Sequence, residues 1–207
     1  MRIIRAGDQT TTPWKNGGGS TTEIAAEPAG ASLDSFDWRI SMAQVATDGP
    51  FSEFPGIDRT LSVVKGGGLV LTVGDNAPVV LDRGSPAISF AGDIATSARL
   101  IAGEITDLNV MTRRLRFSHR LRRIGEPESC DFDGAHVAVV LSLNGSTALT
   151  SKRDAATLDH GDAAVLVQAD DACFRMAPDA ASDCYLVLLS RCVSQAFDDL
   201  DGDNYLG

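Results

Sequence analysis

The sequence predicts an all-β protein made of two similar β-units in one compact chain. Short apolar runs of strand length, rich in Val, Leu and Ile, alternate with clusters of Gly, Pro, Asn and Asp. The apolar spacing of an amphipathic helix is hard to find along the chain. Many short strands separated by turn residues are typical of β-sandwiches and β-barrels.

Each expected strand is an apolar run with turn residues at its ends. Thr22, Ile24 and Ala26 alternate with other residues and predict a first strand after a glycine turn. One short helix is predicted over SRCVSQAFDDL, residues 190–200. The further expected strands are FDWRISMAQVA from Phe36, TLSVVKGGGLVLTV from Thr60, APVVLD from Ala77, DLNVMTRRL from Asp107, HVAVVLSLNG from His136, DAAVLVQ from Asp162 and CYLVLLSR from Cys184.

An internal repeat supports the division into two units. LDRGSPAISF from Leu81 matches LDHGDAAVLV from Leu158, with Leu, Asp, Gly and Ala in the same positions. Upstream, VVKGGGLVL from Val63 aligns with LSLNGSTAL from Leu141 once an insertion is allowed. Each copy contains a strand, a glycine turn, a strand, L-x-x-G and a further strand, which predicts two copies of one β-unit.

The charge balance excludes some classes of partner. The net charge is −10 and the pI is about 4.6, whereas nucleic-acid affinity depends on Lys and Arg. We therefore expect no nucleic-acid partner, and we expect the basic segment Arg113–Arg123 to pair with carboxylates of the chain itself. No apolar leader or membrane-length apolar stretch occurs in the sequence. These features predict a cytoplasmic protein without a membrane partner.

The motifs of the chain resemble those of a known family. A strand, glycine turn and strand followed by L-x-x-G-[DS] is similar to the cupin barrel, and two copies are similar to a bicupin. PWKNGGGSTTEIA, FDWRISMAQVATDGPFSEFPGIDRTL and DLNVMTRR, in this order, resemble the HutD/Ves family over essentially the full length. The resemblance implies a bicupin of two jelly-roll barrels, which we assign to residues 1–120 and 121–207, with an exchange of strands between the halves left open. It also implies an association with histidine utilisation in bacteria, and it brings no established reaction.

The sequence gives no support to a metal centre. Many cupins hold a metal through an H-x-H pair, a glutamate and a later histidine. The corresponding region, FPGIDRTLSVVKGGG, contains no histidine, and His119, His136 and His160 are scattered. We therefore expect no metal and no cofactor. No G-x-S-x-G nucleophile elbow occurs, and an acid–base pair built on His119 stays open, so enzymatic activity is undecided.

The glycine-rich stretch after Pro13 is the first candidate binding element. It is not a phosphate-binding loop, because Lys15 precedes the glycines instead of following them. Glycine N–H groups can hold a carboxylate, Trp14 offers a flat apolar wall, and an Asn side chain can donate and accept. The alternative is a tight corner under the first barrel. The predicted rim of the ligand pocket consists of Trp14, Lys15, Asn16, Gly17 and Gly18.

Arg59 is the predicted polar anchor of the site. It follows Pro55 and Gly56 and lies in an otherwise apolar strand between Asp58 and Thr60, which we include in the site. A buried guanidinium is costly unless it is paired, and it binds carboxylates through two parallel hydrogen bonds. Regular strand alternation turns Asp58 and Arg59 to opposite sides. The alternative is a structural arginine in a salt bridge at the barrel mouth.

Two further strands carry polar residues with the alternation of a strand face. Arg39 and Ser41 share a face of one strand, and Asp107, Asn109 and Met111 share a face of another. Polar residues on an inward face of a barrel need partners, and a ligand can be one of them. We include Arg39, Ser41, Asn109 and Met111 in the site. The sequence does not decide whether these faces point inward or into solvent.

These features predict the metal-free binding of a small anionic metabolite, a carboxylate, in a pocket walled by Trp14 and anchored by Arg59. The family resemblance implies a ligand from histidine degradation, such as urocanate or formylglutamate, and a regulatory or governing role. Two alternatives stay open, a metal-free isomerase or epimerase and a structural or interaction protein without a ligand. A homodimer is left open as well.

Overall fold

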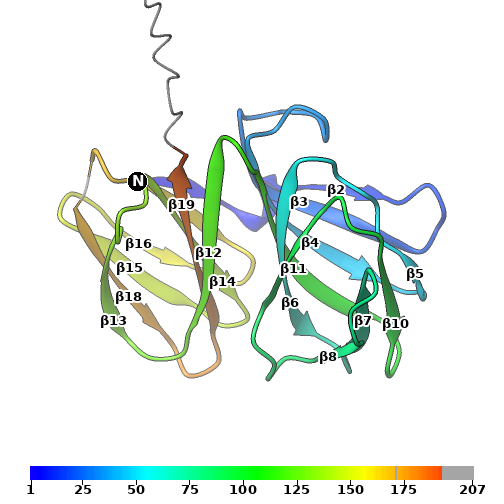
Figure 1. The fold of residues 1–207 in the computed structure, drawn as a ribbon. Helices are drawn as coiled ribbons and strands as arrows, with labels where there is room; N and C mark the ends of the chain where they lie inside the picture. Colours follow the sequence, from blue (N-terminus) through cyan, green and yellow to red (C-terminus); the bar gives the residue numbers. More distant parts are fainter. Residues whose placement is uncertain (171, 193–207) are drawn as a thin grey trace, which may run out of the picture.

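The computed structural model describes residues 1–170 and 172–192 and consists mainly of β-sheet (Figure 1). Four sheets of antiparallel strands form two sandwiches that lie side by side. This arrangement confirms the predicted all-β, cupin-type fold. Within these residues the helical structure is the 3-10 turn η1 (Ala6–Asp8). No helix of the described part is long and apolar enough to cross a membrane.

The first unit combines a large and a small sheet. The large sheet contains, in spatial order, β2 (Thr10–Pro13), β3 (Gly19–Glu27), β4 (Trp38–Val45), β11 (Ile105–Arg113), β6 (Ile57–Lys65) and β9 (Ile88–Ala91). The small sheet contains β5 (Gly49–Pro50), β10 (Thr96–Leu100), β7 (Leu69–Val73) and β8 (Val79–Leu81).

The second unit is built in the same way. Its large sheet contains β1 (Arg2–Ile4), β17 (Ala163–Val167), β14 (Val137–Leu143), β19 (Asp183–Arg191) and β12 (Phe117–Ile124). Its small sheet contains β13 (Glu128–Asp131), β18 (Cys173–Pro178), β15 (Thr147–Ser151) and β16 (Ala155–Leu158).

The order of the strands confirms the internal repeat that the sequence predicts. In the large sheets, β9, β6, β11 and β4 correspond to β17, β14, β19 and β12. In the small sheets, β5-β10-β7-β8 corresponds to β13-β18-β15-β16. The buried Leu81 and Leu158, which begin the two L-x-x-G motifs, end the equivalent strands β8 and β16.

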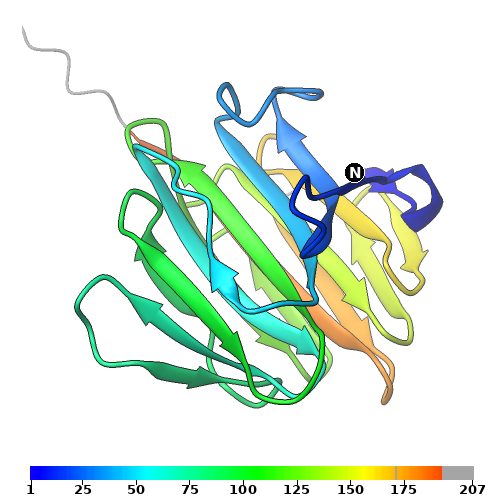
Figure 2. The ribbon, with the colours of Figure 1, turned by 90° about the vertical axis from the view of Figure 1, so that its right-hand side faces the viewer.

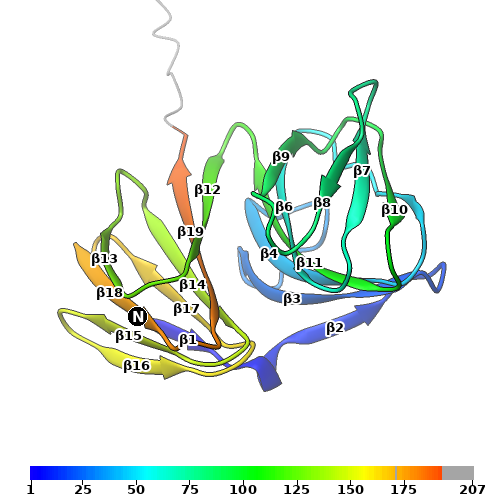
Figure 3. The same ribbon diagram turned by 90° about the horizontal axis from the view of Figure 1, so that it is seen from below.

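The first strand of the chain lies in the second unit (Figure 3). β1 pairs with β17, with Arg2 opposite Val165 and Ile4 opposite Ala163. The following strand, β2, pairs with β3 in the first unit. At the other end of the first unit, β12 runs across the predicted boundary at residue 120 and pairs with β19. Residues 2–4 therefore complete a sheet whose other strands come from the second half of the chain.

The two large sheets form the apolar core between the units. In Figure 2 the first unit lies in front of the second. Trp38 and Ile40 of β4 and Leu108 of β11 pack in one cluster with Val139 of β14 and Val187 of β19. Because strand residues alternate between the two faces of a sheet, the residues between them on β4 and β11 point into the first barrel.

The interiors of the two barrels differ in chemistry. The second barrel is filled by apolar side chains, among them Phe132 and Phe174, whose rings meet edge to face at 5.6 Å. In the first barrel, one end is apolar, with Leu61 and Leu71 in its core cluster. The strands of its large sheet also bring buried polar residues inside. The interior of the first barrel is therefore more polar than that of the second.

The predicted C-terminal helix falls mostly outside the described residues. Ser190 and Arg191, where we expected it to begin, are the last residues of strand β19. β19 continues to this point because each of its residues from Cys184 onward pairs with β12. Residues 193–200 of the expected helix lie beyond the described part.

Candidate functional site

Three neighbouring strands turn polar side chains into the first barrel. β11 lies between β4 and β6, and the register of these strands sets side chains in rows across the sheet. Leu61, Val63 and Ala43 on this face belong to the core cluster of the first barrel, so the face points inward. The rows across β4, β11 and β6 are Arg39–Met111–Arg59, Ser41–Asn109–Leu61 and Ala43–Asp107–Val63.

Arg59 is a buried cation surrounded by aromatic rings. It is 5% exposed, and its guanidinium carbon lies 5.2, 5.5 and 5.3 Å from the ring centroids of Phe51, Phe54 and Phe90. Its Nη1 donates a hydrogen bond of 3.3 Å to the carbonyl oxygen of Ser52, while Nε has no partner. Burial lowers the pKa of Arg59 to about 10, so the group remains charged at neutral pH.

Asp107 is the second buried ionisable group on this face. It is 1% exposed, and its Oδ1 has no hydrogen-bond partner. Burial raises the pKa of Asp107 to about 7, although the nearby charge of Arg59 acts in the opposite direction. Among the ion pairs of the described residues, none joins Asp107 to Arg59. The carboxyl group therefore changes its charge close to neutral pH.

Asn109 completes a set of unpaired polar atoms. Its Oδ1 is buried and has no partner. In the described part of the chain, the buried side-chain nitrogen and oxygen atoms without a partner are Nε of Arg59, Oδ1 of Asp107 and Oδ1 of Asn109. Native structures pair nearly all such atoms with protein, water or ligand. All three atoms belong to residues on the same inward face of the large sheet.

Arg39 belongs to the same face but is already paired. Its Nε donates to Oε2 of Glu23 on the neighbouring strand β3, at 2.8 Å, and its Nη1 donates to Oγ of Ser41 at 3.2 Å. This pairing neutralises Arg39 and leaves Arg59 as the cation without a carboxylate partner. We call Arg39, Ser41, Arg59, Asp107 and Asn109 the polar cluster.

Comparison with known proteins places the chain in a family. A family model described as HutD matches residues 6–186. The chain belongs to the HutD family. The resemblance predicted from the sequence motifs is thereby confirmed.

Curated relatives and a solved structure agree with membership in the HutD family. One relative is an uncharacterized 21.2 kDa protein in the hutC 3′ region of Pseudomonas putida, which is 38% identical over 122 residues. The match covers 59% of this chain and 63% of that protein, which is less than two thirds of its length. Protein Ves of Citrobacter koseri is 37% identical over 140 residues, 67% of this chain and 71% of that protein. The structure of HutD from Pseudomonas fluorescens SBW25 is 31% identical, with a TM-score of 0.78 over 93% of this chain and 99% of that chain.

The glycine-rich stretch of this HutD chain forms the turn between β2 and β3. Lys15, Asn16 and Gly17 are exposed, and Oδ1 of Asn16 accepts a hydrogen bond from the N–H of the buried Gly18. Trp14 packs against the apolar end of the first barrel and donates from Nε1 to Oγ1 of Thr21, at 2.8 Å. These contacts form a tight corner. No hydrogen bond or ion pair within the described residues joins this corner to Arg59, and its role as a ligand rim stays a prediction.

Asp58 and Thr60 lie on the face of β6 opposite to Arg59, as alternation requires. Asp58 is in an ion pair with Arg114, at 2.8 Å. Thr60 is bonded through Oγ1 to Nε2 of His119, at 2.7 Å, and to Oγ of Ser89. The structure therefore does not bring these two predicted site residues to the polar cluster.

His119 packs between the two units of the HutD chain. Its Nδ1 is 2.8 Å from Oγ1 of Thr112 on β11, while its Nε2 contacts Thr60 on β6. Burial lowers the pKa of His119 to about 4, so the ring is neutral at pH 7. Its contacts lie on the side of the sheet away from the polar cluster. Among the described residues, no three His, Cys, Asp or Glu side chains gather as metal ligands.

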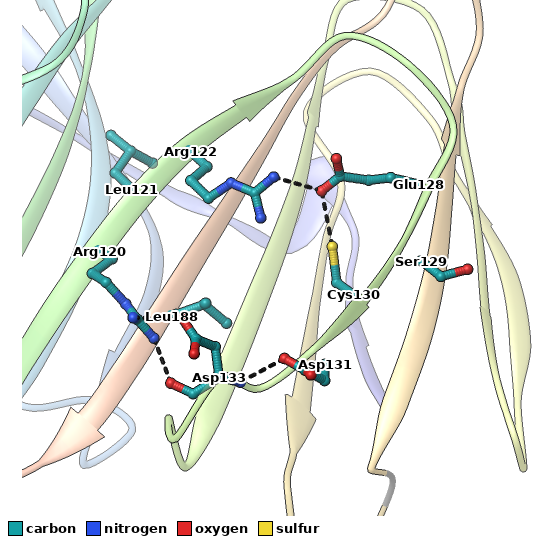
Figure 4. A pocket seen from close by; sticks show the side chains of 9 residues that line it. All are labelled: Arg120, Leu121, Arg122, Glu128, Ser129, Cys130, Asp131, Asp133 and Leu188. Carbon is teal, nitrogen blue, oxygen red and sulfur yellow. Dashed lines mark hydrogen bonds and ion pairs between the residues drawn. The ribbon is translucent and has the colours of Figure 1, made fainter.

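A groove on the second unit differs from the polar cluster in that its basic side chains are paired with carboxylates (Figure 4). Arg120 is paired with Asp133 at 2.6 Å, and Arg122 with Glu128 at 2.8 Å. Burial and the adjacent Glu128 raise the pKa of the Cys130 thiol to about 11, so this thiol stays protonated. The charges in the groove are already neutralised by each other, and an anion gains little there.

Several residues in and around the polar cluster are not among those predicted from the sequence. It did not select Asp107, although alternation placed it on the same face as Asn109. It also did not select Glu23 or the aromatic residues around Arg59. The signal available in the sequence was that Phe51 and Phe54 lie close to Arg59 along the chain. Phe90 becomes a neighbour of Arg59 only through the pairing of β9 with β6.

Proposed function

We propose that this HutD family member binds a small carboxylate-bearing metabolite inside its first barrel. The observation that carries the proposal is Arg59, a buried guanidinium with an unpaired Nε and no carboxylate partner. Guanidinium groups bind carboxylates through charge-assisted hydrogen bonds, which are about twice as strong as neutral ones. A bound carboxylate would supply the missing acceptor and the missing countercharge together.

The proposed ligand comes from histidine degradation. The name of the Pseudomonas putida relative sets that protein in the hutC 3′ region, and we propose the same association with histidine utilisation for this chain. Urocanate and N-formylglutamate each combine a carboxylate for Arg59 with an N–H group for an unpaired oxygen such as Oδ1 of Asn109. In this proposal the protein governs the pathway by binding such an intermediate without a metal.

A thermal-shift series tests the ligand and the anchor together. The wild type, Arg59→Gln and the control Arg120→Gln are each titrated with urocanate, N-formyl-L-glutamate, glutamate and histidine. A ligand at a hundred times its dissociation constant stabilises the native state by about 2.7 kcal/mol. Losing the charged partner is expected to weaken binding by at least about 30-fold in Arg59→Gln. The control changes an arginine that lies in the groove of the second unit and is expected to bind like the wild type.

Two results would contradict the proposal. If Arg59→Gln responds to the same ligand as strongly as the wild type, the anchor is elsewhere. If Arg120→Gln loses the response and Arg59→Gln keeps it, the groove of the second unit is the site.

A second candidate function is a metal-free proton-transfer reaction, which is favoured by Asp107. A buried carboxyl group with a pKa of about 7 suits a general base, because such a base works best with a pKa near the operating pH. Exchange of carbon-bound hydrogen in the ligand against D2O, followed by NMR, tests this function. Exchange in the wild type that is lost in Asp107→Asn supports it, and binding without exchange leaves the protein a binding protein.

A further inference from the structure

Asp107 has an environment that offers no partner to a carboxylate. It lies on the central strand β11, and the residues beside it are the apolar Ala43 on β4 and Val63 on β6. Its side chain is 1% exposed and its Oδ1 is unpaired. An isolated buried carboxylate is costly, so a group in this position tends to bind a proton.

Few charged groups face Asp107 from the surrounding elements. On the same face of this sheet these are Arg59 of β6, Arg39 of β4, Glu23 of β3 and, at the far end of β11, Arg113, which donates to the carbonyl oxygens of Phe36 and Asp34. Arg39 and Glu23 are paired with each other, so Arg59 is the cation that acts on Asp107. The inward side chains of the small sheet carry no charge, because Leu69, Leu71, Val73, Leu81 and Ala98 belong to the core cluster and the buried Thr96 donates its hydroxyl to the carbonyl oxygen of Ile94.

We propose that Asp107 takes up a proton when a carboxylate ligand binds to Arg59, and that in its neutral form it donates the new O–H to the ligand. This inference rests on the proposed carboxylate site. The proton comes from solvent, and no covalent bond of the ligand is made or broken. Asp107 thereby couples anion binding at the first barrel to pH.

The physical reason is that the ligand and Asp107 share one cation. In the free protein Arg59 favours the ionised form of Asp107, while burial opposes it and prevails. A bound carboxylate neutralises Arg59 and adds a second negative charge nearby. Both effects raise the pKa of Asp107 above its value of about 7 in the free protein. By linkage, a group whose pKa rises on binding makes the binding stronger as the pH falls.

Isothermal titration calorimetry measures this proton directly. The wild type is titrated with formate and with N-formyl-L-glutamate, whose groups do not titrate between about pH 6 and about pH 8.5. Each titration is repeated in buffers of different ionisation enthalpy, and the slope of the observed enthalpy gives the protons taken up. The expected uptake is about half a proton near pH 7, approaching one at about pH 8. The affinity is expected to fall by roughly 10- to 30-fold between about pH 6 and about pH 8.5.

Two variants assign the proton to its residue. Asp107→Asn keeps the shape and the hydrogen-bonding capacity of a neutral carboxyl group. It is expected to bind both anions without proton uptake and with an affinity that does not change with pH. The matched control is Asp133→Asn, which makes the same chemical change in the second unit and is expected to keep the uptake of the wild type. The wild-type measurement decides the existence of the linkage even if Asp107→Asn folds poorly.

The outcomes separate this inference from the function on which it rests. Binding by the wild type with no proton uptake, or with proton release, would overturn the linkage and leave the carboxylate site intact. Uptake that persists in Asp107→Asn would assign the proton to another group and overturn the role of Asp107. No heat of binding from either anion at about pH 6 would overturn the carboxylate site itself, and the linkage with it.

Discussion

Three aromatic rings surround the charged guanidinium of Arg59, and no carboxylate of the described residues is paired with it. The faces of Phe51, Phe54 and Phe90 attract the guanidinium and offset part of its lost hydration. They do not neutralise its charge. Arg114, by contrast, is paired with two carboxylates on the surface, Asp58 and Asp93. In the proposed site, an anion would therefore bind Arg59 without first having to displace a protein carboxylate.

At the same scale, Asp107 is expected to make the stability of the free protein depend on pH. Its pKa of about 7 in the folded state lies above the value of about 3.9 in an unfolded chain. The stability that it contributes is therefore fully present below about pH 4 and is lost as the pH rises through about 7. Asp107→Asn removes this loss. The free energy of unfolding of the variant, relative to the wild type, is expected to rise by about 1 kcal/mol per pH unit between about pH 5 and about pH 7.

Urea unfolding at several pH values measures this difference. Asp133→Asn, in which the carboxyl group is exposed, is the control and is expected to follow the wild type. A difference between Asp107→Asn and the wild type that stays constant over this range would show that Asp107 titrates like an exposed carboxyl group.

The turn that leads from β6 in the large sheet to β7 in the small sheet depends on a glycine conformation. Gly66 has φ of +94°, and a Cβ there would lie 2.5 Å from the carbonyl oxygen of Glu104. Gly103 has φ of +67° with nothing within 4 Å of such a Cβ. Gly66→Ala is therefore expected to lower the free energy of unfolding by about 3 kcal/mol, and Gly103→Ala by about 1 kcal/mol. Chemical denaturation of both variants checks this order, which equal losses would contradict.

Strand elements and their repeat could be predicted from the sequence because local patterns determine them. Short apolar runs mark the strands, and LDRG and LDHG mark equivalent turns in the two units. The orientation of a strand face is not local. Asp107 and Leu108 alternate correctly in the sequence, but only the packing of β11 against both barrels decides that Leu108 faces the second unit and Asp107 the barrel interior.

The polar cluster could be predicted only in part for the same reason. Arg59 was recognised because a charged residue in an apolar strand is a local anomaly. Asp58 and Thr60 were included with it, and they lie on the other face of β6, at Arg114 and His119. The aromatic rings around Arg59 come from a loop and from β9, whose position beside β6 requires the folded sheet.

At the scale of the whole molecule, His119 links the two units through a partly buried neutral ring. β12 carries His119 into contact with Thr60 and Thr112 on the large sheet of the first unit. Apolar contacts from both large sheets surround this link in one core. The stability of each unit therefore depends on its contact with the other. A change in the charge of His119 changes the stability of both units.

Protonation of His119 is expected to destabilise the protein in acid. Its folded pKa of about 4 is below the value of about 6.5 in an unfolded chain. The stability that it contributes is present above about pH 6.5 and is lost as the pH falls through about 4. The wild type is expected to lose about 3 kcal/mol relative to His119→Gln over this range. Unfolding of both proteins at pH steps checks this, and parallel profiles would contradict it.

The position of β1 has a consequence for the order in which the chain can fold. Residues 2–4 leave the ribosome before every strand of the first barrel, yet their partner strand β17 is among the last to be made. The second barrel can therefore close its sheet only after nearly the whole polypeptide has been synthesised. Pairings between such distant segments slow folding, because a long loop must close before they form. During co-translational folding, the first barrel, which contains the polar cluster, is expected to form before the second. Strand β1 then stays unpaired until the other strands of its sheet have been synthesised.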